Sequence, residues 1–535
     1  MVQKKKGSNY IAGEAIERVL PVTNKYWFQF SHLLKLNLIL LVPLLSSSVA
    51  GYDGKLESSA SNFYMTNISI GSLMNGLQTL PQWKEYFNHP QGALLGLVNA
   101  AQSIGSVVAL PAVGMLSDKF GRKKVLLSGI IIILIATIIG ATSINMAMLV
   151  ISRIVVGAGG MLVVQPSPML IAELSYPTHR GKYTSAFWTM YYLGAILASW
   201  VTFGTQDYTS TMSWRIPTIL QACWPLVQLT AIWWLPESPR WLVANDRAHE
   251  ARAILCKHHA GGDLDSALVN LEMEEIAESI QLERTAASGG WGWGALVATP
   301  GNRKRLFIAV FLGSAAQWNG IGVVSYYLTL VLDSVGITDV FMQTLINGLL
   351  QIFNFWAALS AAFLVDRLGR RVLFLWSGVG MLVSYIVWTA CSAVNSNTGS
   401  KPAGIVVVVC LFTFFFHYDI AYTPLLMSYP TEIFPYTLRS KGLTCELLSI
   451  YASLVIAAFV NPIGLENIGW RYYIVFCCFL VVILAVTYFV FPETKGYSLE
   501  EIAEIFDGPG VALDSAFVKE DNEKGGIERI ENKDV

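Results

Sequence analysis

The sequence predicts an all-α integral membrane protein whose twelve transmembrane helices form two six-helix bundles. Of its 535 residues, 54% are hydrophobic and only 14% are charged, which is more apolar than a typical soluble protein. Apolar runs long enough to cross a hydrocarbon core of about 30 Å recur along the chain. A short charged connector containing glycine appears once in each half, between two such runs. These three observations together predict a duplicated membrane fold.

The apolar runs fall into two groups of six that are separated by a long polar segment. The first group predicts helices near 33–52, 93–115, 124–142, 146–170, 184–204 and 214–235. The second predicts helices near 306–332, 342–364, 372–392, 403–428, 443–464 and 470–491. The resulting organisation is an N-terminal tail over 1–32, a first bundle over 33–242, a linker with short amphipathic helices over 243–304, a second bundle over 305–496, and a C-terminal tail over 497–535.

Lys and Arg predict the orientation, because they concentrate in loops on the cytoplasmic side of a membrane. The short loops after the second, fourth, eighth and tenth runs hold most of these residues, so both termini and the linker are expected in the cytoplasm. The segment 54–91 is then extracellular. Its one N-x-S site begins at Asn67, which is either a glycosylation site or an unused sequon.

The two charged connectors are DKFGRKK at 118–124 and DRLGRR at 366–371. A glycine in each supplies the backbone freedom that a tight turn between two helices requires. Further acidic and basic residues recur at matching places in both halves, and carboxylate and guanidinium groups there can form bidentate pairs. Two similar halves predict a secondary transporter that works by rocking one half against the other. The expected cytoplasmic gate consists of Asp118, Arg122, Glu173, Arg180, Glu237, Asp366, Arg370, Glu432 and Arg439, with Glu446 as a further expected member.

Two interpretations of these charged residues remain open. They are either a clamp that closes only in the outward-facing state or static anchors for the helix ends. The other classes of function lack their usual patterns. The net charge of −1 argues against nucleic-acid binding, and the seven cysteines show no metal-ligand spacing. We therefore expect neither an enzyme nor a cofactor or metal, and no cleavable signal peptide precedes the first run.

Several motifs together resemble the sugar porter family of the major facilitator superfamily. They are GYD at 51–53, DKFGRK, SPMLIAEL, PESPRWL, DRLGRR, EIFP and PETKG, spread over about residues 45 to 505. The stretches QWNGIGVVSYYL at 317–328 and YTPLLMSYPTEIFPYTLRSKGL at 422–443 are most similar to fungal lactose and oligosaccharide permeases and their hexose-carrying relatives. The resemblance implies the major facilitator fold, a monomer in the plasma membrane, and a mono- or disaccharide as substrate.

Charged residues inside the apolar runs are the expected proton-coupling groups. Asp53 ends the first run and Arg153 lies within the fourth, and each would be costly in hydrocarbon without a partner. Protonation of Asp53 would release Arg153, which is the role that the matching residues have in proton-coupled sugar porters. The alternative is that Asp53 only marks the outer interface and caps a helix. Asp419, with His417 nearby, is either a second titrating group, a sugar ligand, or a satisfied structural residue.

The expected sugar site consists of polar and aromatic side chains inside apolar runs, since hydroxyls need directed partners and sugar faces stack on aromatic rings. Asn354 and Tyr422 match the spacing of sugar-binding residues in the family. The alternative is that such residues only join helices to one another. The candidates are Gln317, Trp318, Asn319, Tyr326, Tyr327, Gln351, Asn354, Tyr422 and Trp188.

Three positions depart from the family pattern. Trp188 and Ala195 stand where monosaccharide porters carry hydrogen-bonding residues, and Gly322 replaces an Asn. These changes predict an altered or roomier pocket. The preferred interpretation is a sugar:proton symporter that works by alternating access. A passive sugar or polyol facilitator, an efflux carrier and a non-transporting sugar sensor remain as alternatives.

Overall fold

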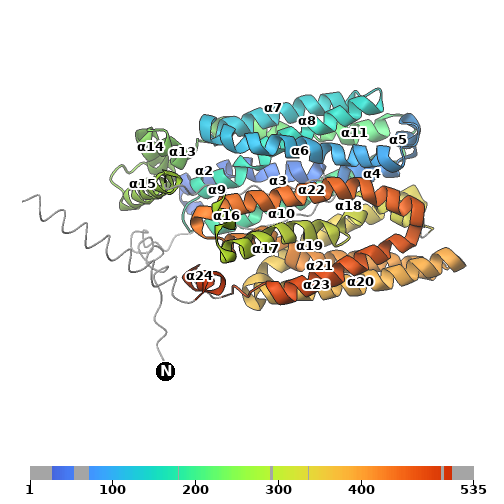
Figure 1. Cartoon of the computed structure of the whole chain (residues 1–535). Coiled ribbons are helices and arrows are strands. Elements are labelled where there is room, and N and C mark those ends of the chain that lie inside the picture. Colours follow the sequence, from blue (N-terminus) through green and yellow to red (C-terminus); the bar gives the residue numbers. More distant parts are fainter. Residues whose placement is uncertain are drawn as a thin grey trace, which may run out of the picture.

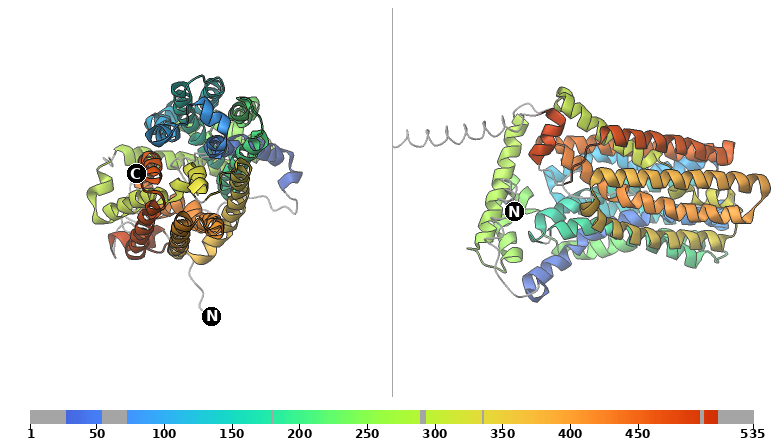
Figure 2. Two further views of the ribbon diagram at one scale, coloured as in Figure 1. Left: turned by 90° about the vertical axis from the view of Figure 1, so that its right-hand side faces the viewer. Right: turned by 90° about the horizontal axis from the view of Figure 1, so that it is seen from below.

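The computed structural model describes residues 27–53, 72–178, 180–288, 293–334, 336–495 and 499–508. Every element in these ranges is a helix, and the long helices run side by side in one elongated bundle (Figure 1). The short helices of the linker gather with α24 (Leu499–Asp507) at one end of this bundle, which we call the linker end (Figure 2). Helix α5 (Pro81–Tyr86) lies at the opposite end (Figure 1).

The first half of the chain forms one group of helices (Figure 1). Three interruptions divide predicted runs: the fourth breaks at Gln165, before two closely spaced prolines, the first at Leu40, and the sixth after Leu220. The elements are η1 (Trp27–Gln29), α2 (Ser31–Ile39), α3 (Leu41–Asp53), α4 (Ser72–Thr79), α5, α6 (Gly92–Phe120), α7 (Arg122–Ala141), α8 (Met146–Val164), α9 (Pro166–Leu174), α10 (Arg180–Thr205), α11 (Met212–Leu220), α12 (Cys223–Ala231) and η2 (Ile232–Trp234).

The linker and the second half follow. The linker holds α13 (Pro239–Ala244), α14 (Ala248–His259), α15 (Ala267–Ser288) and α16 (Ala295–Ala298). The second half holds α17 (Pro300–Trp318), α18 (Ile321–Ser334), α19 (Val340–Leu368), α20 (Arg370–Thr398), α21 (Lys401–Ile433), α22 (Tyr436–Ile468), η3 (Gly469–Arg471) and α23 (Tyr472–Val490). Helices α17 and α18 are separated at Gly320, which has a φ of 101°.

Each of the twelve predicted runs is occupied by helix in the structure. Among the described residues, eight helical stretches are both long enough and apolar enough to cross a membrane by themselves. The predicted count of twelve spans is therefore not confirmed. The eight are Ser31–Tyr52, Ala93–Phe120, Arg122–Ala141, Met146–Leu174, Met212–Trp234, Arg370–Thr398, Pro402–Thr423 and Lys441–Val490, the last of which covers two predicted runs.

Two pairs of long helices join the halves. Helix α6 packs against α22, and α10 packs against α19. The first contact is close, because a Cβ atom at Gly96 would lie 2.8 Å from the carbonyl oxygen of Ala458. In the second, the Thr344 hydroxyl donates to Gln206 Oε1 at 2.5 Å and Asn347 Nδ2 donates to Ser199 Oγ at 3.3 Å. The centre of the bundle is thus bordered by helices of both halves.

The linker helices are attached to the bundle through a buried histidine. Nδ1 of His259 on α14 lies 2.9 Å from Glu272 of α15, and its Nε2 lies 3.1 Å from the carbonyl oxygen of Leu174 at the end of α9. Its neighbour His258 is also buried, and burial together with Lys257 lowers the pKa of His258 to about 4. His258 is therefore neutral at physiological pH and packs as an uncharged side chain.

Candidate functional site

Four buried amides lie on α17 and α19, and two of them stand at the break between α17 and α18. Gln317 and Asn319 come from the end of α17, and Gln351 and Asn354 share one face of α19. The side chains of all four are at most 2% exposed. The Asn319 side chain accepts a hydrogen bond of 3.0 Å from the backbone N–H of Ile321, which begins α18. The break in the helix therefore places polar groups within an otherwise apolar core.

Several atoms of these amides have no hydrogen-bond partner among the described residues. They include Nε2 of Gln317, Nδ2 of Asn319, Oε1 of Gln351 and both amide atoms of Asn354. A buried polar group without a partner costs about 1–3 kcal/mol, and folded proteins contain few of them. A bound molecule that carries several hydroxyl groups would remove this cost. Together, the four amides therefore have the chemistry of a site for a polyhydroxylated ligand.

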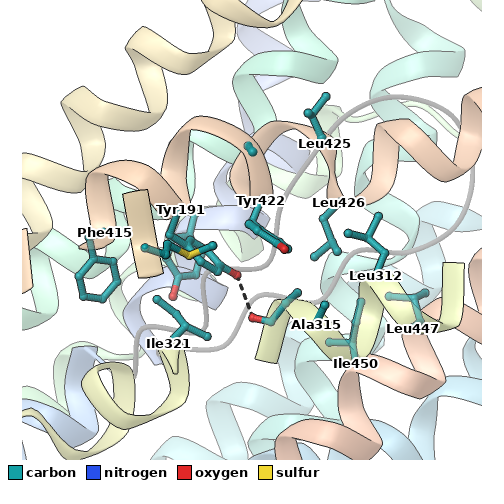
Figure 3. Packing of buried hydrophobic residues seen from close by; sticks show 14 of the residues in the cluster. Tyr191, Leu312, Ala315, Ile321, Phe415, Tyr422, Leu425, Leu426, Leu447 and Ile450 are labelled. Carbon is teal, nitrogen blue, oxygen red and sulfur yellow. Dashed lines mark hydrogen bonds between the residues drawn. The ribbon is translucent and has the colours of Figure 1, made fainter. Parts of the chain in front are cut away.

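Aromatic rings border the same core. Tyr422 of α21 stacks on Tyr418 at 5.3 Å between ring centroids and meets Phe374 of α20 edge-on at 5.6 Å. Tyr191 of α10 belongs to the same buried cluster as Phe415 and Tyr422, together with residues of α17, α18 and α22 (Figure 3). Rings from both halves thus surround the centre of the bundle. The sequence analysis did not single out Tyr191, although it stands three residues after Trp188 in the same apolar run.

For the remaining four sugar-site candidates, the structure describes the side-chain contacts of only one, Trp318. Trp318 is half-buried and its ring packs edge-on against Phe479 of α23, with 5.1 Å between centroids. Trp188 lies on α10, and Tyr326 and Tyr327 lie on α18, but their side chains fall outside the described residues.

Asp419 links the two halves at the centre of the bundle. Its side chain is fully buried in α21, and one carboxylate oxygen accepts hydrogen bonds from Thr423 at 2.7 Å and from the Tyr192 hydroxyl at 3.2 Å. Tyr192 belongs to α10 in the first half. The other oxygen, Oδ2, has no described partner. His417 does not join this group, since its Nδ1 lies 2.7 Å from the carbonyl oxygen of Thr413 in its own helix.

The other expected proton-coupling residues are Asp53 and Arg153. Asp53 is the last residue of α3, and its side chain falls outside the described residues. The guanidinium of Arg153 on α8 donates to the carbonyl oxygen of Val98 at 3.1 Å and to Gln102 Oε1 at 3.0 Å. Arg153 is thus held against α6, so the proposed pairing with Asp53 stays a prediction.

In the first half, the charged residues at the linker end form one network. The Glu237 carboxylate accepts hydrogen bonds from the backbone N–H groups of Arg122 at 3.0 Å and Lys123 at 3.1 Å, at the start of α7. A carboxylate is favourable there because the first N–H groups of a helix have no partner within it. The Arg122 side chain lies 3.7 Å from Asp118 and 3.8 Å from Glu173, which also accepts a hydrogen bond from Ser238.

The second half repeats this network with different residues. The Glu493 carboxylate accepts from the backbone N–H groups of Arg370 at 2.9 Å and Arg371 at 3.0 Å, at the start of α20. The Arg370 guanidinium donates to Glu432 at 3.0 Å, and Glu432 also accepts from Thr494. Gly121 and Gly369 precede these two helices with nearly equal φ angles of 96° and 98°. A side chain there would be strained and would crowd Glu237 or Glu493.

The described contacts of each network join helices of the same half. Arg439 is half-buried on α22, whereas the side chains of Arg180 and Asp366 and the whole of Asn67 fall outside the described residues. The expectation that Glu446 belongs to the gate stays a prediction, and no described contact joins it to the network. Its side chain is fully buried in α22, and its carboxylate oxygens have no hydrogen-bond partner among the described residues. The helical phase of α22 turns it toward α17 rather than toward the charged network.

A cavity of about 410 Å³ lies at the opposite end of the bundle, away from the four buried amides. Its walls come from both halves and include Trp83 and Lys84 of α5, Asp333 of α18 and Glu466 of α22. The two halves are therefore not closely packed at this end.

Comparison with known proteins identifies the fold and the family. Residues 39–506 match the family model described as Sugar (and other) transporter. The chain belongs to this sugar transporter family. The predicted resemblance is thereby confirmed, and the match covers both halves and the linker.

Relatives of this sugar transporter include fungal transporters. It is 30% identical to the low-affinity glucose transporter HXT3 of Saccharomyces cerevisiae over 78% of this chain and 73% of the yeast protein. It is also 30% identical to the MFS-type transporter criB of Aspergillus cristatus, over 86% of this chain and 92% of that protein. These relatives are transporters rather than enzymes.

The fold is shared with a solved transporter. The inward-open structure of the xylose transporter XylE from E. coli matches with a TM-score of 0.70 and 24% sequence identity, covering 88% of this chain and all of the bacterial protein (100%). The chain therefore has the fold of major facilitator transporters.

Proposed function

We propose that this membrane protein carries a mono- or disaccharide into the cell across the plasma membrane, together with a proton. The buried amides without described partners carry the proposal, because two stand at a broken helix and two lie on α19, which packs against α10 of the other half. Family membership supports a sugar as the ligand. The distribution of Lys and Arg supports cytoplasmic termini, and all the candidate groups belong to one chain, so a monomer suffices.

The test of sugar transport is uptake into cells that lack their own sugar transporters. Labelled glucose, xylose, maltose and lactose are supplied separately, with and without a protonophore. We expect saturable uptake of at least one of them, and a protonophore should abolish accumulation above the external concentration. Absence of uptake for every sugar, with the protein present at the cell surface, would contradict the proposal. Uptake that only equilibrates would favour the facilitator.

In the proposed mechanism, a proton biases the carrier between its two orientations. Consider an acid that pairs with a base in one orientation and is neutral in the other. Its protonation shifts the equilibrium between the two orientations by the difference in its interaction free energy between them. Asp53 and Arg153 are the first proposed pair. The hydrogen bond from Tyr192 to Asp419 supports a second group, since it joins the halves across the centre and depends on the charge of Asp419.

Asp53→Asn is expected to abolish accumulation against a gradient while part of the downhill exchange remains. The amide keeps the shape of the side chain but cannot exchange a proton. Arg153→Leu should impair the same step. Uptake and counterflow are measured side by side in vesicles. Full accumulation by Asp53→Asn would show that the coupling group lies elsewhere, and Asp419→Asn would then be tested in the same assay.

Disaccharides are expected to compete for the site. Gly322 leaves out a side chain on α18, although the amide of Asn461 approaches to 3.0 Å from the position of its absent Cβ. The Asn461 amide thus supplies a polar group beside Gly322, and Trp188 offers a surface for a second ring. Competition for the site is measured as inhibition of labelled sugar uptake by maltose, lactose and glucose. Inhibition by glucose alone would contradict the roomier pocket.

A further inference from the structure

Glu446 is an acidic residue in an apolar seam between two helices. It lies on α22 with Leu443, Leu447 and Ile450, which recur at the spacing of one helix face, and all four are at most 2% exposed. This face packs against α17. Gly313 of α17 makes room for it, since a Cβ atom there would lie 2.7 Å from the backbone oxygen of Glu446 and 3.4 Å from its Cγ.

The carboxyl group of Glu446 has no hydrogen-bond partner among the described residues for either oxygen. An ionised carboxylate in such a place loses its hydration without compensation, so the group binds a proton instead. Asp419 differs, because two hydroxyl groups donate to it. Burial and the absence of a partner therefore make Glu446 a neutral acid in this conformation.

The charged groups on the surrounding helices do not compensate Glu446 in the structure. Arg305 is the basic residue of α17 nearest in sequence, but it precedes Gly313 by eight residues, or roughly 12 Å of helix. It is already paired with Asp507 of α24 at 2.7 Å. The other charged or titratable residues on the packed elements are Asp118 and Lys119 of α6, Arg303 and Lys304 of α17, Tyr326, Tyr327 and Asp333 of α18, Lys401, Cys410, His417, Tyr418, Asp419, Tyr422, Tyr429 and Glu432 of α21, Tyr436, Arg439, Lys441, Cys445, Tyr451 and Glu466 of α22, Arg471 of η3, and Tyr472, Tyr473, Cys477, Cys478 and Tyr488 of α23.

Glu446 also lies near the candidate sugar site. Gly313 and Gln317 are four residues apart on α17 and share one face, with a rise of about 6 Å between them. Nε2 of Gln317 has no described partner, and Glu446 packs beside Gly313, which lies one turn closer to the linker end than Gln317. A neighbouring pair of hydroxyls, Ser314 and Ser449, lies 2.7 Å apart in the same seam. Sugar occupancy and the charge of Glu446 are thus able to affect one another.

We propose that Glu446 is a proton-binding site of the transporter, located between the sugar site and the linker end. The inference rests on the proposed sugar:proton symport. The O–H bond of Glu446 stays intact while the seam is dry. When water reaches the seam from the linker end, that bond breaks and the proton passes to water. While Glu446 is ionised, the seam cannot exclude water again without the cost of burying the charge, and binding of a new proton removes that cost.

The first test is independent of transport. The infrared spectrum of the purified full-length protein is compared between wild type and Glu446→Gln at neutral pH. We expect the variant to lose one C=O absorption of a protonated carboxyl group without hydrogen bonds. Glu274→Gln, which changes an exposed carboxyl on α15, should lose none. An unchanged protonated-carboxyl region in Glu446→Gln would overturn the proposal, whatever sugar the protein carries.

The second test uses proteoliposomes and the sugar taken up best in the panel above. Glu446→Gln should exchange sugar at a rate near that of wild type but should fail to accumulate it under an imposed proton gradient. Glu446→Asp should retain part of the accumulation. Gradient-driven accumulation by Glu446→Gln equal to that of wild type would overturn the proposal. If wild type itself fails to accumulate sugar, the symport is wrong, and the infrared comparison still decides the protonation of Glu446.

Discussion

Asn354→Leu is expected to weaken sugar binding by roughly thirtyfold without lowering the stability of the empty protein. Asn354 is buried, and neither of its amide atoms has a hydrogen-bond partner among the residues that the structure describes. The loss of two hydrogen bonds to the sugar, at about 1 kcal/mol each, corresponds to that factor. The empty protein loses no hydrogen bond to a described residue, and it is relieved of a buried polar group that has no described partner. Its unfolding temperature should therefore stay the same or rise.

The matched control is Asn302→Leu. The amide of Asn302 is half-buried near the linker end, donates to the carbonyl oxygen of Ala295 at 3.0 Å and accepts from Arg305 at 3.0 Å. Its replacement should lower the unfolding temperature and leave sugar binding unchanged. Binding is measured by titration of the purified protein, and stability by thermal unfolding. If Asn354→Leu is destabilised like the control and still binds sugar, Asn354 only joins helices.

Glu432→Gln is expected to destabilise the second half and to increase access to the linker end. Arg370 would lose its charged acceptor at 3.0 Å, and hydrogen bonds to charged groups contribute about 1.5–3 kcal/mol. Because the pair is partly exposed, the effect should fall at the lower end of that range. Thermal unfolding and labelling of cysteines introduced near the linker end measure the two effects.

The duplication supplies the comparison for this prediction. Glu173 occupies the place of Glu432 in the first half, with Arg122 and Ser238 in place of Arg370 and Thr494. Glu173→Gln should therefore reproduce both effects in the first half. Lower stability with unchanged labelling in both variants would show that the networks are static anchors. Unchanged stability and labelling would contradict any role for these pairs.

The sequence predicted most reliably those features that depend on local pattern. The repeated connectors led directly to Arg122 and Arg370, which the structure places in matching networks with Glu173 and Glu432. Polar residues within apolar runs led to Gln317 and Asn354. Both features follow from residue types and spacing, because a buried polar side chain in a membrane helix needs a partner or a ligand.

Features that depend on tertiary packing were not predictable. The hydrogen bond from Tyr192 to Asp419 joins residues of different halves, and nothing in the sequence near either residue indicates the other. Glu446 was placed in the gate because of its distance from the end of its run. Its surroundings depend on the rotation of α22 against α17, which a hydropathy pattern does not fix with that precision.

Proton movement on addition of sugar tests the central claim most directly. Purified protein is reconstituted into proteoliposomes without an imposed gradient, and the pH of a weakly buffered medium is followed when the best-transported sugar is added outside. Symport predicts an alkaline shift of the medium that follows sugar entry, that a protonophore abolishes, and that Asp53→Asn lacks. Entry of sugar with no change in the pH of the medium would contradict coupling and show that the protein is a facilitator.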